Sequence, residues 1–210
     1  RGLCGAAPFL GIITKITVKT QPLNPLTVWQ VYLTKEELIE AIKQAESWPN
    51  SHTLQWFWGN KIKVYVVIET SLEKQIEHSY NLKSEFPCSK SIKVSNVLGL
   101  KTIPDFGLRS PSSNDHSSIH SEVLGVLGPG WGLNCNQLIK SISEIMTKRP
   151  NQNCYIAAQQ LGGISNQIDR ELTSFIYRNS IWKPWINASW TAGDLKEREK
   201  SLAWLNEVWQ

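Results

Sequence analysis

The stretch TLQWFWGNKIKVYVVIET, from Thr53 to Thr70, decides the fold class of this chain. Two runs rich in β-branched and aromatic residues, 53–58 and 61–70, flank Gly59-Asn60. Runs of this composition joined by a two-residue turn of this type predict an antiparallel β-hairpin. Antiparallel strands commonly form a sheet with one face packed on a core, so we expect other elements of the chain to cover one face of this hairpin.

Helical and extended patterns alternate on both sides of the hairpin. Upstream, residues 26–33 alternate as a strand, and Thr34 with Glu37 forms a capping-box pattern that starts a helix ending near residue 47. Further helices are predicted at 71–86, 134–148 and 197–209, the last with Leu202, Leu205 and Trp209 as its buried stripe. Further strands are predicted at 92–98, 154–160, 173–178 and 182–190, and a Ser-rich loop at 104–121. The pattern predicts an α+β fold, a large antiparallel sheet with helices packed on one face.

The composition is that of a globular protein, and it reduces the classes of partner that we expect. The 210 residues are 41% hydrophobic and 19% charged, and the net charge of +4 comes from scattered basic residues. Without a basic cluster we expect no nucleic-acid partner, and without a long apolar run we expect no membrane span. Ten tryptophans are unusual and suit cores or ligand clefts. The cysteines lack metal-ligand spacing, and we expect buried thiols at Cys4, Cys88, Cys135 and Cys154.

The segment IWKPWINASW, residues 181–190, is the strongest internal candidate for a ligand surface. Side chains alternate across a strand, so one face carries Lys183, Trp185, Asn187 and Ser189. The opposite face is mostly apolar and is expected to pack on helices. Polar and aromatic residues are interleaved in the same way around Trp56, Trp58 and Gln159. Such mixtures suit sugar rings or planar organic molecules through stacking and hydrogen bonds, while the alternative is a solvated sheet face.

The opening segment, residues 5–18, combines a small-residue loop with a β-branched strand. Glycine and alanine allow a backbone to approach a ligand closely, because little or no side chain intervenes. A loop of this kind normally lies between the strands of a nucleotide-binding domain. We therefore expect this segment to be the end of one domain rather than the start of a protein.

Several of these segments resemble one family of flavoenzymes. Residues 5–14, GAAPFLGIIT, resemble a Gly-rich segment of FAD-linked oxidases of the p-cresol methylhydroxylase and vanillyl-alcohol oxidase type. Residues 173–190 resemble the Phe-Pro-His-Arg strand pair of the berberine-bridge-enzyme-like branch. Gly162-Gly163 and the helix carrying Trp204 stand in the family's order. The resemblance covers almost the whole chain and only the C-terminal, substrate-domain portion of the family.

The resemblance implies a domain division and a cofactor. Residues 1–22 would be the terminal strand region of an FAD-binding domain, and 26–210 the substrate domain, whose sheet roofs the flavin. The backbone would contact FAD at Gly5, Ala6, Gly11, Ile12 and Ile13. The family's flavin-attaching His and Cys and its C-terminal Tyr-x-Asn signature have no counterpart here.

Two departures concern catalysis. Tyr177 stands where the family has a His before an Arg, and Lys183 where some plant members have a catalytic Glu. A lysine acts as a base only when burial lowers its pKa strongly, so the chemistry of those plant enzymes does not transfer. Tyr177 and Lys183 remain the candidate catalytic residues, and Trp56, Trp58, Gln159, Trp185 and Asn187 the candidate substrate-binding residues.

Three functions stay open at this point. The first is part of an FAD-dependent oxidase of an alcohol, oligosaccharide or secondary metabolite, with a second chain carrying the FAD-binding half. The second is a cofactor-independent small-molecule binder or cyclase, with a pocket formed by Trp56, Trp58, Trp185 and Lys183. The third is an inactive remnant whose exposed sheet favours self-association. The resemblance fits a secreted or endomembrane location, and the sequence itself indicates none.

Overall fold

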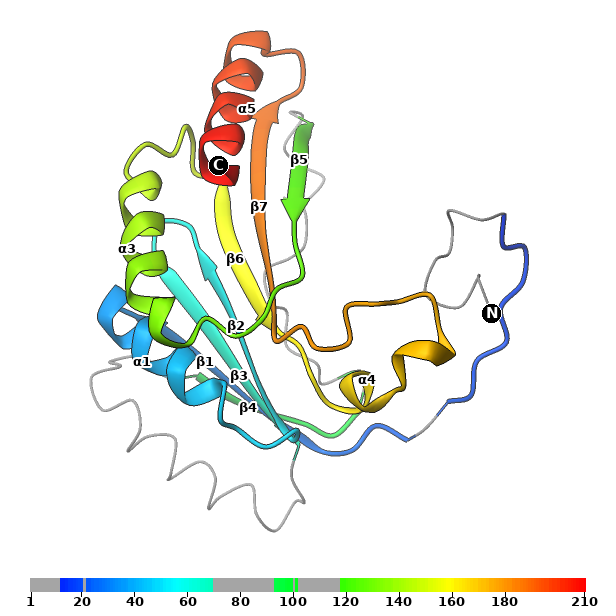
Figure 1. Cartoon of the computed structure of the whole chain (residues 1–210). Helices are drawn as coiled ribbons and strands as arrows, with labels where there is room; N and C mark the ends of the chain where they lie inside the picture. Colours follow the sequence, from blue (N-terminus) through cyan, green and yellow to red (C-terminus); the bar gives the residue numbers. More distant parts are fainter. Residues whose placement is uncertain (1–11, 21, 70–92, 100, 102–117) are drawn as a thin grey trace.

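The computed structural model describes residues 12–20, 22–69, 93–99, 101 and 118–210. The described strands form a single antiparallel sheet with helices on one face (Figure 1). Its seven strands have the order β4-β1-β3-β2-β6-β7-β5. Every neighbouring pair is antiparallel. The strands are β1 (Leu26–Leu33), β2 (His52–Trp58), β3 (Ile62–Glu69), β4 (Lys93–Val97), β5 (Ile119–Gly125), β6 (Tyr155–Gln160) and β7 (Trp182–Thr191). The predicted fold class is confirmed, including the hairpin of β2 and β3 that Gly59 and Asn60 help to close.

Three long helices lie together on one side of the sheet, whereas α4 lies apart from them (Figure 1). The described helices are α1 (Lys35–Ala45), α3 (Cys135–Met146), α4 (Ile164–Gln167) and α5 (Leu195–Trp209), with short 3-10 turns at Gly132–Asn134 and Arg170–Leu172. The predicted capping box is present: the Thr34 hydroxyl accepts from the Glu37 amide, and the Glu37 carboxylate accepts from the Thr34 amide. This reciprocal pair satisfies two amides that the first helical turn leaves unpaired, and so fixes where α1 begins.

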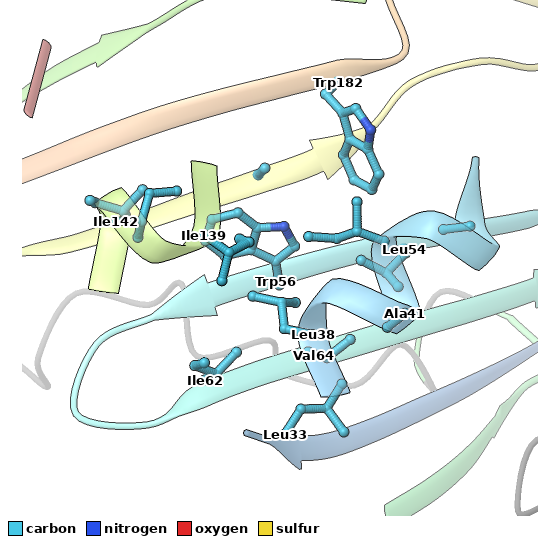
Figure 2. Packing of buried hydrophobic residues seen from close by; sticks show 14 of the residues in the cluster. Leu33, Leu38, Ala41, Leu54, Trp56, Ile62, Val64, Ile139, Ile142 and Trp182 are labelled. Carbon is cyan, nitrogen blue, oxygen red and sulfur yellow. The ribbon is translucent and has the colours of Figure 1, made fainter. Parts of the chain in front are cut away.

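The hydrophobic core fills the layer between the sheet and these helices (Figure 2). Strand residues Trp56, Val64 and Trp182 are fully buried there against Leu38 of α1 and Ile139 of α3. Burying a Val, Leu or Ile side chain contributes roughly 1.5–3 kcal/mol to the stability of the folded protein. The core therefore fixes which face of each strand points towards the helices, and which face is left for other uses.

Four local expectations are wrong or shifted. Residues 173–178 form no strand, because the Thr173 hydroxyl accepts from the Phe175 amide and from Arg178 Nη2 and so curls the backbone locally. Residues 119–121, expected in the Ser-rich loop, belong to β5. Residues 12–20 pair with no described strand. In α5 the buried aromatic is Trp204, and Trp209 is exposed. The helix predicted at 71–86 lies outside the described residues.

Candidate functional site

The two faces of β7 have the division that its sequence predicts. Trp182, Ile186 and Ala188 are buried on the helix-covered face. Lys183 and Trp185 lie on the opposite face, where they line a cleft. Pro184, which cannot donate a backbone hydrogen bond, sits where the ladder to β5 ends: its carbonyl accepts from the Val126 amide just beyond that strand. A proline is therefore accommodated in a strand that has neighbours on both sides.

The cleft has a volume of about 1010 Å³ and lies on the open face of the sheet. Its floor comes from β2, β5, β6 and β7, and one wall comes from the irregular segment between β6 and β7. Four residues singled out from the sequence meet here: Gln159, Tyr177, Lys183 and Trp185. The sheet and the irregular segment thus bring together residues that are up to 26 positions apart in the chain, from 159 to 185.

Strand register arranges the cleft residues of the sheet, and their neighbours on the same face, in two adjacent rows. In the polar row, Gln55, Gln159 and Lys183 are direct register partners across β2, β6 and β7. In the next row, Phe57 and Trp185 both pair with Ala157, whose small side chain lets the two rings meet at 5.6 Å between centroids, edge to face. The Lys183 ammonium lies 6.0 Å from the Trp185 ring centroid, so the two rows are in contact.

The wall of the cleft carries Phe175, Tyr177 and Arg178. Tyr177 is exposed, and its ring packs against Phe175 at 6.0 Å in a T-shaped arrangement. Arg178 is only 9% exposed, and its guanidinium lies over the Phe175 ring at 4.8 Å. The sequence assigned no role to Phe175 or Arg178, because the burial of Arg178 and its packing on Phe175 are properties of the folded segment. A signal was available in Thr173, whose hydroxyl can compete with strand pairing.

Trp56 and Trp58 do not belong to this cleft, so the predicted pocket of Trp56, Trp58, Trp185 and Lys183 is wrong. Both tryptophans occupy positions of β2 that face the helices, with Trp56 fully buried (Figure 2). Trp56 meets Trp131 at 6.0 Å, edge to face, and Trp131 stacks on Trp182 at 5.1 Å. Phe57, the residue between them in β2, lies on the opposite face, where its ring meets Trp185. A period of two places neighbouring aromatics on opposite faces.

Asn187 shares the open face but is buried beyond the cleft. Its amide donates to the Asn153 carbonyl at 3.1 Å and to the Ser189 hydroxyl at 2.7 Å. That hydroxyl in turn hydrogen-bonds Ser121 of β5 at 2.8 Å. The amide is thus occupied by hydrogen bonds within the protein, and Asn187 does not line the cleft with Lys183 and Trp185. Its predicted contact with substrate finds no support in this geometry.

The residues expected to contact FAD lie largely outside the described part. Gly5, Ala6 and Gly11 are not described, while Ile12 and Ile13 are exposed and do not line the cleft. The cleft itself fits one face of a planar ring system: it offers the Trp185 indole for stacking and amide and ammonium donors for carbonyl oxygens. These groups therefore suit the ring system of a cofactor such as FAD, or that of a planar substrate.

The titratable groups of the described residues add two constraints. No group of three His, Cys, Asp or Glu side chains that could hold a metal ion occurs among them. Cys135 and Cys154 are free buried thiols, as expected. Burial, reinforced by Glu46, raises the pKa of Cys135 to about 11. A thiol with so high a pKa is a poor nucleophile, so Cys135 serves the core.

None of the described helices has the length and apolar character needed to cross a bilayer.

Comparisons with known proteins show which proteins share this one-sided antiparallel sheet. No protein-family model matches the sequence. The chain is 22% identical over 213 residues to the uncharacterized FAD-linked oxidoreductase YgaK of Bacillus subtilis (strain 168), covering 96% of this chain and 44% of YgaK.

Solved structures give the same result for the fold. CrmK, a flavoenzyme involved in shunt product recycling in caerulomycin biosynthesis, matches with a TM-score of 0.68 at 15% identity, over 90% of this chain and 42% of CrmK. Physcomitrella patens BBE-like 1 matches with a TM-score of 0.66 at 13% identity, over 89% of this chain and 43% of that protein. The resemblance to the berberine-bridge-enzyme-like FAD-linked oxidoreductases is confirmed, and the chain spans less than half the length of these proteins.

Proposed function

We propose that this chain forms the substrate-binding part of an FAD-dependent oxidoreductase that acts on an alcohol, an oligosaccharide or a secondary metabolite. The observation that carries the proposal is the cleft, where Gln159, Tyr177, Lys183 and Trp185 meet on the open face of the sheet. YgaK is an FAD-linked oxidoreductase and CrmK is a flavoenzyme, which favours a flavin as the group this face covers. When bound, FAD would supply two-electron oxidation of the substrate.

In this proposal residues 26–210 form the substrate domain, and residues 1–22 belong to the edge of the FAD-binding part. The backbone of Gly5, Ala6, Gly11, Ile12 and Ile13 would contact the cofactor. A partner chain would supply the remaining flavin contacts. The exposure of Ile12 and Ile13 is compatible with such a partner, because exposed apolar side chains become buried at an interface.

The roles of the cleft residues follow from their chemistry. Lys183 is exposed and brings three N–H donors and one positive charge, so it is assigned to binding and orienting oxygen atoms. Tyr177 is exposed at the wall, where its hydroxyl both donates and accepts and suits proton exchange with a substrate hydroxyl. Trp185 and Gln159 would hold a ring by stacking and by hydrogen bonding.

The test is purification of the protein from its natural source under native conditions, with a visible absorption spectrum and intact mass spectrometry on the same sample. The proposal expects a flavin spectrum and a flavin-binding polypeptide that accompanies these residues. A colourless, flavin-free monomer that does not bind added FAD would contradict it. Tyr177→Phe and Lys183→Gln should then slow flavin reduction by substrate, whereas Lys61→Gln, at an exposed lysine over Tyr32 and away from the cleft, should not.

A second candidate function rests on the same cleft, because an indole and a neighbouring ammonium group can bind a planar molecule without a cofactor. A cofactor-independent binding protein or cyclase would use Lys183 and Trp185 without any flavin. It predicts ligand binding or turnover that does not change when FAD is added. Loss of either on removal of FAD would rule it out in favour of the oxidoreductase.

A further inference from the structure

We infer that the cleft is selective for a planar aromatic molecule bearing a carboxylate, which Arg178 and Lys183 hold from two sides of the cleft. This inference rests on the proposed substrate-binding role of the cleft and adds to it the chemical class of the ligand. The observations behind it are the charge balance of the lining residues and the incomplete pairing of Arg178.

Arg178 is a buried cation without an acidic partner among the described residues. Its Nη1 donates to the Ser165 carbonyl at 3.3 Å and its Nη2 to the Thr173 hydroxyl at 2.6 Å, both neutral acceptors. Its Nε is buried and has no hydrogen-bond partner. A buried charge costs free energy unless an opposite charge and hydrogen bonds compensate it. An anion in the cleft would supply that compensation.

The remaining hydrogen-bonding capacity of Arg178 suits a carboxylate. A guanidinium presents its donors in a planar fork that matches two carboxylate oxygens. Packing on Phe175 holds the plane of the group at the wall of the cleft. The fork is thus held in place before a ligand arrives, which lowers the entropy lost on binding.

Lys183 adds a second positive charge on the floor of the same cleft. No Asp or Glu occurs among the described residues that line it. Two cations with no compensating acid favour an anionic ligand over a neutral or cationic one. The neighbours of Lys183 in register, Gln159 and Gln55, are neutral amides that can bind further polar groups without changing the sign of the charge.

The aromatic character of the ligand follows from Trp185. Its indole lies beside the Lys183 ammonium and forms part of the cleft lining. Gly125 of β5 is its register partner, and a Cβ there would come within 3.2 Å of the Trp185 Cβ. The glycine therefore leaves the space that Trp185 occupies, and the indole offers a surface on which a flat ring can stack.

Two sources could supply such an anion: the carboxylate of a small aromatic substrate, or the phosphates of a dinucleotide. The flat indole of Trp185, which lies beside Lys183 and lines the same cleft as Arg178, favours the aromatic carboxylate. Competition with inorganic pyrophosphate distinguishes the dinucleotide from the aromatic carboxylate, because pyrophosphate has the phosphates but no aromatic ring.

The experiment compares two probes of nearly equal shape, 4-hydroxybenzoate and 4-hydroxybenzyl alcohol, by titration calorimetry on the full-length protein with and without FAD. We expect the carboxylate to bind at least about tenfold more tightly, the usual effect of a charge-assisted hydrogen bond. Lys183→Gln and Arg178→Lys should each reduce that preference about threefold or more, the first by removing a charge and the second by removing the fork. Lys61→Gln should leave it unchanged.

Equal affinity for the two probes, or no binding of either in both conditions, would overturn the inference. So would displacement of the benzoate by millimolar pyrophosphate, which would assign the cations to a dinucleotide. Because Lys183 is exposed, its variant is informative even where Arg178→Lys fails to fold. Selectivity for the carboxylate is independent of flavin reduction, so failure of the oxidoreductase proposal and failure of this inference give different results.

Discussion

The indole Nε1 of Trp182 donates to the Glu46 carboxylate at 2.8 Å, which ties the inner face of β7 to the C-terminal cap of α1. The same carboxylate accepts from the Trp131 amide at 2.5 Å and from the Gly132 amide at 3.1 Å. One side chain thus joins a strand, a helix end and the loop before α3. This clamp holds the helix-covered face of β7, while Lys183 and Trp185 on the other face stay available to the cleft.

Glu46→Ala should lower the free energy of unfolding by about 3 kcal/mol, because it leaves several partly buried donors without an acceptor. Denaturant unfolding followed by tryptophan fluorescence measures this. The matched control is Glu40→Ala on the same helix, which removes only an exposed pair with Lys43 and should change stability by less than about 0.5 kcal/mol. Equal effects of the two variants would show that the clamp does not stabilise the fold.

Trp56→Ala and Trp185→Ala should have opposite consequences, because the two tryptophans lie on opposite faces of the sheet. Truncating the buried Trp56 should cost about 3–5 kcal/mol of stability. Trp185→Ala should cost less stability and remove most of the affinity for an aromatic ligand. Thermal unfolding and ligand titration on both variants check the assignment, and loss of ligand binding in a folded Trp56→Phe variant would contradict it.

Gly125→Ala should displace Trp185 and weaken ligand binding. The added Cβ would lie 3.2 Å from both the Pro184 carbonyl oxygen and the Trp185 Cβ, and crowding of this kind costs about 1–3 kcal/mol. Gly128→Ala is the control, since a Cβ there meets no atom within 4 Å. Ligand affinity and melting temperature measured together would show a loss of both at position 125 and of neither at position 128.

The buried thiol of Cys135 predicts a pH dependence of stability. Burial, with Glu46 as the next cause, raises its pKa from 9.0 to about 11 in the folded protein. The unfolded chain therefore loses this proton first, so the contribution is complete below pH 9.0 and is lost as the pH rises to about 11. The stability difference between the wild type and Cys135→Ala should shrink over that interval, and a difference that stays constant would argue against a buried neutral thiol.

Much of the fold could be predicted from sequence because its signals are local. The capping box of Thr34 and Glu37, the turn at Gly59-Asn60 and the alternation in β7 each depend on residues a few positions apart. The two faces of β7 were assigned correctly for the same reason. The segment 173–178 was misjudged because its bulky residues resemble a strand, while hydrogen bonds of the Thr173 side chain curl it.

Only some residues of the candidate site could be predicted from the sequence. Gln159, Lys183 and Trp185 were found from alternation within single strands, and the structure brings them into one cleft together with Tyr177. Trp56 was wrongly grouped with them, because sequence alone gives the alternation of β2 but not which of its faces meets the helices. Arg178 escaped notice because its significance lies in burial without an acidic partner.

The sequence by itself determined the fold class, the local start of α1 and the alternation of each strand, because these depend on backbone geometry over short distances. Only the tertiary structure decided which alternate residues face the cleft. That choice depends on the register between β2, β6 and β7 and on where the helices pack, and a shift of one residue would exchange the faces. Register and helix packing join residues distant in the chain, and so the cleft of Gln159, Arg178, Lys183 and Trp185 is a property of the folded sheet.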